Sequence, residues 1–137
     1  MNAGRSTDRV VPPRGFPEAE LGKRLERAQA YMRDVAMDVM VLTTEENIRY
    51  FSGFLTQFFL SPTRPWFLAV PKAGKPVAVI PTIGAVAMSA TWIEDIRTWS
   101  SPHPTDDGVS LLAQTILEFG HRVGLPMGRE AVLRMPM

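Results

Sequence analysis

Three short and almost uninterrupted runs of apolar residues constrain the fold of this chain more than any other feature. They are Val39–Leu42, Trp66–Val70 and Val77–Ile80. A strand that is covered on both faces of a sheet reads as a continuous apolar run, so each run predicts a buried strand. The residues between the second and third runs include Gly74 and two prolines. This connection predicts a β-hairpin.

Helical periodicity precedes the first run. Over residues 18–34 apolar side chains recur at spacings of four and three, which predicts an amphipathic helix. The residues of its apolar face are Leu21, Leu25, Ala28, Met32 and Val35. The opposite face carries Lys23, Arg24 and Arg27, and we expect these side chains to be solvated.

The remaining elements alternate between helices and strands. After the first run, Thr43 or Thr44 can cap a short helix, and Ser52-Gly53 can end it, because glycine readily adopts the left-handed conformation. Further along the chain we expect a helix over 82–91, weakened by Gly84, and then a half-buried strand over 96–99. A loop over 100–107 follows. It leads into a helix over 109–119, which Asp106 or Asp107 can cap and Gly120 ends, and the last element is a strand over 122–125.

This order predicts an α/β fold in which helices flank a mixed β-sheet. A chain of 137 residues is long enough for one domain with a core and too short for two ordinary ones. We therefore expect a flexible N-terminal arm over residues 1–17 and one domain over residues 18–127. Residues 128–137 then begin a further segment.

Composition excludes several classes of function. Fifteen basic and fourteen acidic residues leave a formal charge of +1, so neither nucleic acid nor an anionic membrane is an expected partner. The absence of cysteine excludes disulfides and thiolate chemistry, and fits a reducing compartment. Residues 1–14 lack the apolar core of a signal peptide, and no window approaches the ~20 apolar residues of a membrane helix. These features predict a cytoplasmic protein.

Motifs for catalysis and metal binding are absent from the sequence. The only histidines are His103 and His121, and no HxH or HExxH pair occurs, so no metal site is expected. Asp106 and Asp107 are explained by capping of the next helix. Neither a nucleophile elbow nor a glycine-rich phosphate loop occurs. We therefore expect no catalytic residue, no metal ligand and no cofactor within this chain.

The stretch from Asn47 to Phe67 is unusually rich in aromatic residues, with two arginines and two prolines. Arg64 lies between Pro62 and Pro65, and a guanidinium held in a rigid loop can bind a carboxylate bidentately. Two interpretations stay open: Arg64 contacts a ligand, or it pairs with a carboxylate of its own or a partner chain. For Phe58 and Phe59 the alternatives are core or dimer packing and ligand contact.

The residues from Leu25 lead through Asp38–Leu42 to Asn47–Phe54. This run resembles the N-terminal domain of the creatinase, prolidase and aminopeptidase P family. In that family a helix leads into a strand with the pattern D-x-x-x-[VL], and then into N-[IV]-x-Y-[LF]-[ST]-G. The likeness continues through the hairpin and the last helix, so it covers most of the chain from about residue 20.

The resemblance implies a ribonuclease H-like fold without nuclease chemistry. It also implies that residues 128–137 begin a linker to a catalytic domain beyond this chain, where a pair of divalent metal ions (Mn, Co, Zn or Fe) is held. The chain would then be inactive alone and would serve oligomerisation, as a homodimer, and substrate gating in an Xaa-Pro dipeptidase, aminopeptidase P or creatinase-like hydrolase. The substrate would be a small peptide or other small molecule.

The resemblance also suggests which residues reach a neighbouring active site in trans. In creatinases an aromatic residue and an arginine of this segment contact the substrate's carboxylate, and by position Phe59 and Arg64 correspond to them. The residues between the two, which include Pro62, make their spacing longer than in creatinases. Together with Trp66 they form the predicted set of substrate contacts. The alternative is a free-standing small-ligand or protein-interaction module of the same fold, which the adjoining coding sequence would distinguish.

Overall fold

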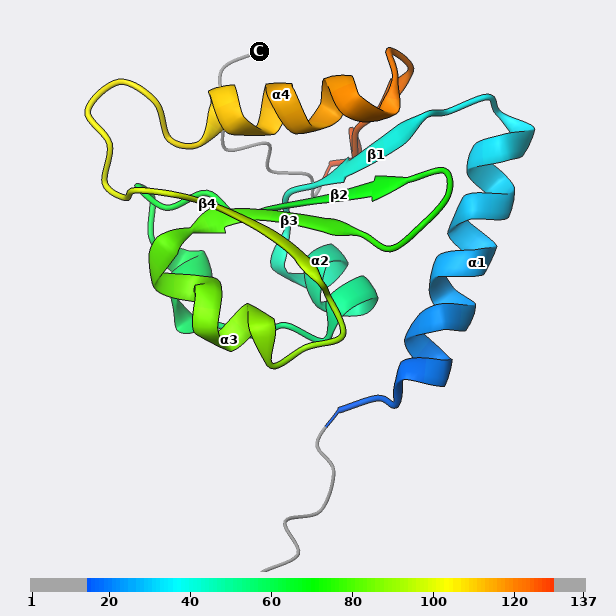
Figure 1. Ribbon diagram of the computed structural model, residues 1–137, viewed down its shortest axis with the longest axis horizontal. Coiled ribbons are helices and arrows are strands. Elements are labelled where there is room, and N and C mark those ends of the chain that lie inside the picture. The colour runs from blue at the N-terminus through cyan, green and yellow to red at the C-terminus, as the bar shows by residue number, and fades with distance from the viewer. Residues whose placement is uncertain (1–14, 130–137) are drawn as a thin grey trace, which may run out of the picture.

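Residues 15–129 are described by a computed structural model, in which one sheet separates two layers of helices (Figure 1). In chain order the elements are α1 (Glu18–Asp34), β1 (Val39–Leu42), α2 (Glu45–Ser52), the 3₁₀ turn η1 (Gln57–Leu60), β2 (Phe67–Pro71), β3 (Val77–Pro81), the 3₁₀ turn η2 (Thr82–Gly84), α3 (Ala85–Ser89), β4 (Asp95–Trp99), α4 (Val109–Phe119) and β5 (Val123–Gly124). Most of the predicted arm over 1–17 and most of the predicted linker over 128–137 lie outside the described residues.

The five strands follow the order β4-β3-β2-β1-β5 and include both parallel and antiparallel pairs. The β2–β3 hairpin is antiparallel and pairs Leu68 with Ala78. β1 pairs antiparallel with β2, whereas β3–β4 and β1–β5 are parallel pairs. The structure thus confirms the predicted mixed sheet and its hairpin.

Alternate residues of the central strands enter two separate apolar layers. Leu68 and Val70 belong to the cluster that α1, α2 and α3 complete, whereas Phe67 packs with Leu112 of α4. Figure 1 shows α4 on one side of the sheet and the other three helices on the opposite side. Because both faces are covered, β2 and β3 are buried at every position, as their continuous apolar runs predict.

Helix α1 has the predicted bounds, but two of its side chains do not lie where periodicity places them. Arg24 is buried instead of solvated, and Val35 is 40% exposed because it caps the end of the helix. The buried Gln29 donates from its amide nitrogen to the backbone oxygens of Pro71 (3.0 Å) and Gly74 (2.8 Å). These bonds attach α1 to the β2–β3 hairpin.

Helix α2 ends as predicted at Gly53, whose φ of 75° is in the left-handed region. Thr44 occupies the N-cap position, although its side chain forms no capping hydrogen bond. The Ser52 hydroxyl donates to the backbone oxygen of Ile48 and accepts from the N–H of Phe54 at 3.0 Å. Phe54 thereby turns into the core.

The helix expected over residues 82–91 is wrong in its extent. The segment divides into η2 and the short α3, and Gly84 lies at the junction. A Cβ at Gly84 would collide with the indole ring of Trp66, so this glycine permits close packing of the turn on the sheet.

The N-cap residue of helix α4 is Gly108 and not one of the two predicted aspartates. Gly108 has a φ of 82° and lies directly against the Trp99 indole. The Asp106 carboxylate still accepts a hydrogen bond from the N–H of Ser110 at 3.2 Å, and hydrogen bonds from Ser110 lower the pKa of Asp106. The predicted capping interaction therefore exists, but the capping carboxylate precedes the N-cap residue.

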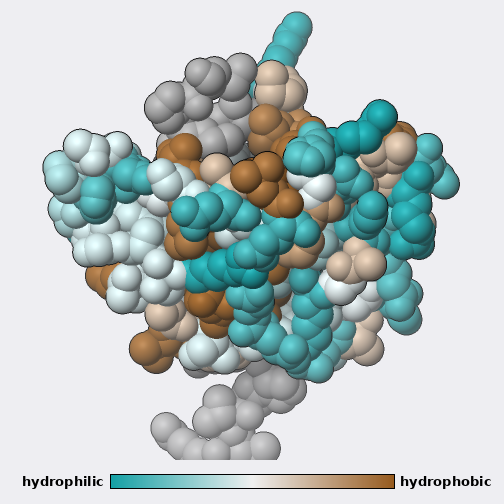
Figure 2. All heavy atoms as spheres, turned by 45° about the horizontal axis from the view of Figure 1, so that its top comes forward, coloured by the Kyte–Doolittle hydropathy of each residue, from teal (hydrophilic) through white to brown (hydrophobic). Residues whose placement is uncertain are grey.

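None of the helices within residues 15–129 combines the length and apolar character that a membrane span requires. On the face seen in Figure 2, hydrophobic side chains lie in separate places between hydrophilic ones.

Candidate functional site

Arg64 lies in the loop between η1 and β2. Its guanidinium Nη1 donates to the Ser61 hydroxyl at 3.2 Å, and its Cζ lies 5.7 Å from the centre of the Phe58 ring. Within residues 15–129, no carboxylate lies within ion-pair distance of Arg64. The side chain is half-buried, so its stem is held while its charge lacks a carboxylate partner in this part of the chain.

Phe59 and Trp66, the other two predicted substrate contacts, are core residues of this chain. They are 4% and 1% exposed. Their rings lie 5.6 Å apart, and Phe54 lies 6.0 Å from Phe59 and 5.5 Å from Trp66. The Trp66 indole N–H donates to the backbone oxygen of Phe58 at 3.3 Å. The three packed rings include the residues at both ends of the Arg64 loop, because Phe59 precedes the loop and Trp66 follows it. Substrate contact by Phe59, Arg64 or Trp66 stays a prediction.

A second loop lies against the Arg64 loop. The Ser101 hydroxyl donates to the backbone oxygen of Thr63 at 3.3 Å, which joins residues far apart in the chain. In this second loop His103 Nδ1 accepts hydrogen bonds from the N–H groups of Thr105 (3.3 Å) and Asp106 (3.0 Å). His103 is thus committed to loop structure, in agreement with the sequence interpretation.

The described residues do not fit the metal pair that the resemblance associates with the family. Between residues 15 and 129 no three His, Asp or Glu side chains gather into a possible metal site. His121 is exposed, and its N–H donates to the Asp38 carboxylate at 3.1 Å. Neither histidine therefore belongs to a cluster of ligands.

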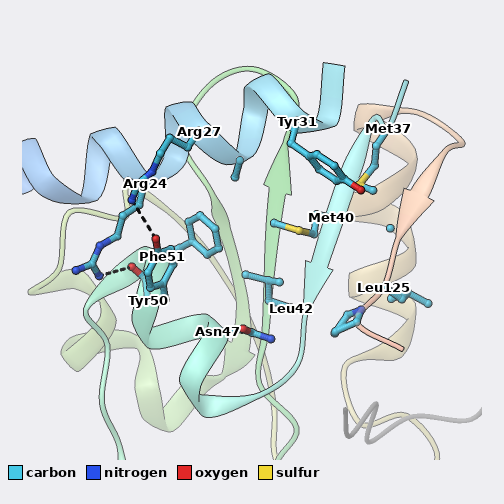
Figure 3. A pocket seen from close by; sticks show the side chains of 13 residues that line it. Arg24, Arg27, Tyr31, Met37, Met40, Leu42, Asn47, Tyr50, Phe51 and Leu125 are labelled. Atoms are coloured by element: carbon cyan, nitrogen blue, oxygen red, sulfur yellow. Dashed lines mark hydrogen bonds between the residues drawn. The ribbon is translucent and has the colours of Figure 1, made fainter. Parts of the chain in front are cut away.

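A hollow that the sequence did not predict lies beside α1. We call it the α1 groove; its volume is about 480 Å³. Apolar side chains of β1, of Met37 before it and of the segment after β5 face α1 and α2 across it (Figure 3). Its apolar lining includes Met37, Met40, Leu42, Phe51, Leu125 and Pro126.

Two arginines of α1, Arg24 and Arg27, and Tyr50 of α2 form the polar end of the α1 groove (Figure 3). The guanidinium of Arg24 lies 4.1 Å from the ring centre of Phe16 and 4.5 Å from that of Tyr50, and donates to the Tyr50 backbone oxygen at 2.9 Å. Arg27 donates to the Tyr50 hydroxyl at 3.2 Å. Arg24 lies three residues after Leu21 and one before Leu25, which places it at the edge of the apolar face. That spacing could have indicated its burial.

Comparison with known proteins gives a family match and several structural likenesses. The family model of the creatinase/prolidase N-terminal domain matches residues 24–131. No curated protein sequence matches the chain significantly. Dipeptidase PepE from Mycobacterium ulcerans has a TM-score of 0.64 and 21% identity, over 87% of this chain and 31% of that one.

Two further structures are covered over most of their own length. A proline dipeptidase structure from Streptococcus pneumoniae has a TM-score of 0.65 at 20% identity, over 80% of this chain and 77% of that one. The N-terminal domain of an Xaa-Pro dipeptidase from Lactobacillus brevis has a TM-score of 0.65 at 17% identity, over 81% of each chain. These likenesses confirm the predicted fold class.

The chain spans about a third of the M. ulcerans dipeptidase. The family match covers most residues of the present chain, including the segment from Asn47 to Phe54. The chain therefore belongs to the creatinase/prolidase N-terminal domain family.

Proposed function

We propose that this chain is the non-catalytic N-terminal domain of a metal-dependent hydrolase that cleaves Xaa-Pro peptides or a related C–N bond. The proposal rests mainly on the family match over residues 24–131. The described residues supply no metal-ligand cluster, so the divalent metal pair is assigned to a domain outside this chain. The roles proposed for the domain are oligomerisation and gating of substrate at a neighbouring active site.

Arg64 is the residue that would contact substrate. Its charge has no carboxylate partner within residues 15–129. The buried Phe59 and Trp66 flank the loop, and the Ser101 hydroxyl donates to the backbone oxygen of Thr63. A guanidinium so placed can bind the carboxylate of a peptide that reaches it from a partner's active site. Phe59 and Trp66 would act through the position of this loop.

The proposal is tested in the complete enzyme by steady-state kinetics on an Xaa-Pro dipeptide. Arg64→Ala should lower kcat/KM by about tenfold or more, because loss of a charge-assisted hydrogen bond costs roughly 1.5–3 kcal/mol. The control is Arg49→Ala, which removes an exposed arginine from α2. Equal kinetics for the two variants would refute substrate contact by Arg64.

The absence of catalysis from this chain is tested separately. The purified chain should not cleave the dipeptide in the presence of Mn²⁺ or Co²⁺. Metal-dependent cleavage by the chain alone would refute its assignment as a non-catalytic domain. Size-exclusion chromatography with light scattering measures the proposed dimer, and a monomer at all concentrations of the complete enzyme would remove the oligomerisation role.

A further inference from the structure

We propose that the α1 groove is the docking site for the continuation of this same chain, residues 127–137. The groove is apolar and open, and the chain itself supplies one of its walls (Figure 3). After β5, Gly124, Leu125 and Pro126 line the groove in succession. The next residue, Met127, is 67% exposed, so the polypeptide passes the groove with an apolar side chain uncovered.

The composition of residues 127–137 matches an apolar groove. Its apolar residues are Met127, Ala131, Val132, Leu133, Met135 and Met137. The groove offers Met37, Met40 and Leu42, and methionine-lined surfaces adapt to irregular apolar side chains. At the rim the Tyr31 side chain is 63% exposed, which leaves further apolar area to be covered.

Reach also favours this segment. Eleven extended residues span at most roughly 36–40 Å, enough to follow the groove from Pro126 toward α2.

A further observation favours this occupant. The family model matches residues up to 131, so the domain's sequence pattern extends beyond β5 into this segment.

Disulfide trapping tests the proposal in the full chain, because the native sequence contains no cysteine. Met40→Cys is combined in turn with Val132→Cys, Leu133→Cys and Met135→Cys. The control combines the same three substitutions with Val86→Cys, which is 84% exposed on α3 near the opposite edge of the sheet. At least one Met40 pair should form an intramolecular disulfide under mild oxidation, at least about tenfold faster than its Val86 counterpart.

A second measurement does not depend on disulfide geometry. In the single variant Met40→Cys, alkylation of the thiol should become at least about tenfold faster when Leu133→Asp and Met135→Asp are added, since carboxylates do not remain in an apolar groove. Alkylation of Val86→Cys should not change. Unchanged alkylation of Met40→Cys, or equal trapping of both sets of pairs, would overturn the proposal. Disulfide-linked dimers without the intramolecular product would overturn it in favour of a second copy in the groove.

Discussion

The Asp38 carboxylate accepts a hydrogen bond from the backbone N–H of Arg122 at 3.0 Å, across 84 positions of the sequence. The same carboxylate accepts from the N–H of His121 and pairs with the Lys72 ammonium at 3.0 Å. Asp38 precedes β1, and Arg122 precedes β5. One side chain thus attaches the last strand to the sheet.

The Asp38 contacts predict a pH-dependent stability. The Lys72 hydrogen bond, followed by the backbone N–H groups, lowers the pKa of Asp38 from 3.8 to about 2. Because the folded-state pKa is the lower one, this stabilisation is present above pH 3.8 and is lost as the pH falls toward 2. Asp38→Asn should therefore lower the Tm at pH 7 and have much less effect near pH 2. Thermal unfolding at both pH values measures this, with the exposed Asp34→Asn as the control. An equal loss of Tm at both pH values would contradict the assignment.

Truncation of the Phe54 side chain should cause a large loss of stability. Phe54 is 2% exposed and packs against Phe59 and Trp66. Phe54→Ala should lower the free energy of unfolding by about 3–5 kcal/mol, because it leaves a cavity among rigid rings. Leu60→Ala, at a residue 82% exposed, should change it by less than about 0.5 kcal/mol. Urea denaturation compares the two variants, and similar losses would show that the aromatic cluster is not a tightly packed core.

Arg24 should have a structural role, although the sequence pattern places it on a solvated face. Arg24→Ala should lower the free energy of unfolding by about 1–3 kcal/mol, because the Tyr50 carbonyl loses a donor and the Phe16 and Tyr50 rings lose a packing partner. Lys23→Ala, at the exposed neighbouring position, should be nearly neutral. Chemical denaturation measures both, and a neutral Arg24→Ala would mean that the guanidinium contributes no net stability.

Replacing Gly108 and Gly22 by alanine should change the stability of the fold in opposite directions. Gly108→Ala should destabilise the fold by about 1 kcal/mol or more, because φ is 82° and the new Cβ would collide with Trp99. Gly22→Ala should stabilise it by about 0.5–1 kcal/mol, because Gly22 lies within α1 with open space around its Cα. Differential scanning calorimetry of the two variants gives the signs. A stabilising Gly108→Ala would show that this contact with Trp99 relaxes at no cost.

Sequence alone determined the elements whose formation depends on local patterns. The apolar runs of β1, β2 and β3 predicted buried strands because each residue of such a run faces a covered side of the sheet. Spacing of the α1 residues predicted that helix to its observed bounds, and Gly53 predicted the end of α2. The residues from Asn47 to Phe54 indicated the family by their pattern alone, and the family match includes them.

Tertiary structure decided which side chains those elements cover. The burial of the charged Arg24 depends on Tyr50, which is distant in sequence. The aromatic Phe59 and Trp66 are buried because the Phe54 ring packs against each of them. The contact of Gly84 with Trp66, at the point where the expected helix divides, is also non-local. Periodicity reports that a helix or strand has a covered face, but it does not report what covers it. The setting of the Arg64 guanidinium and the apolar α1 groove therefore depend on the folded chain, because residues from separate elements form both.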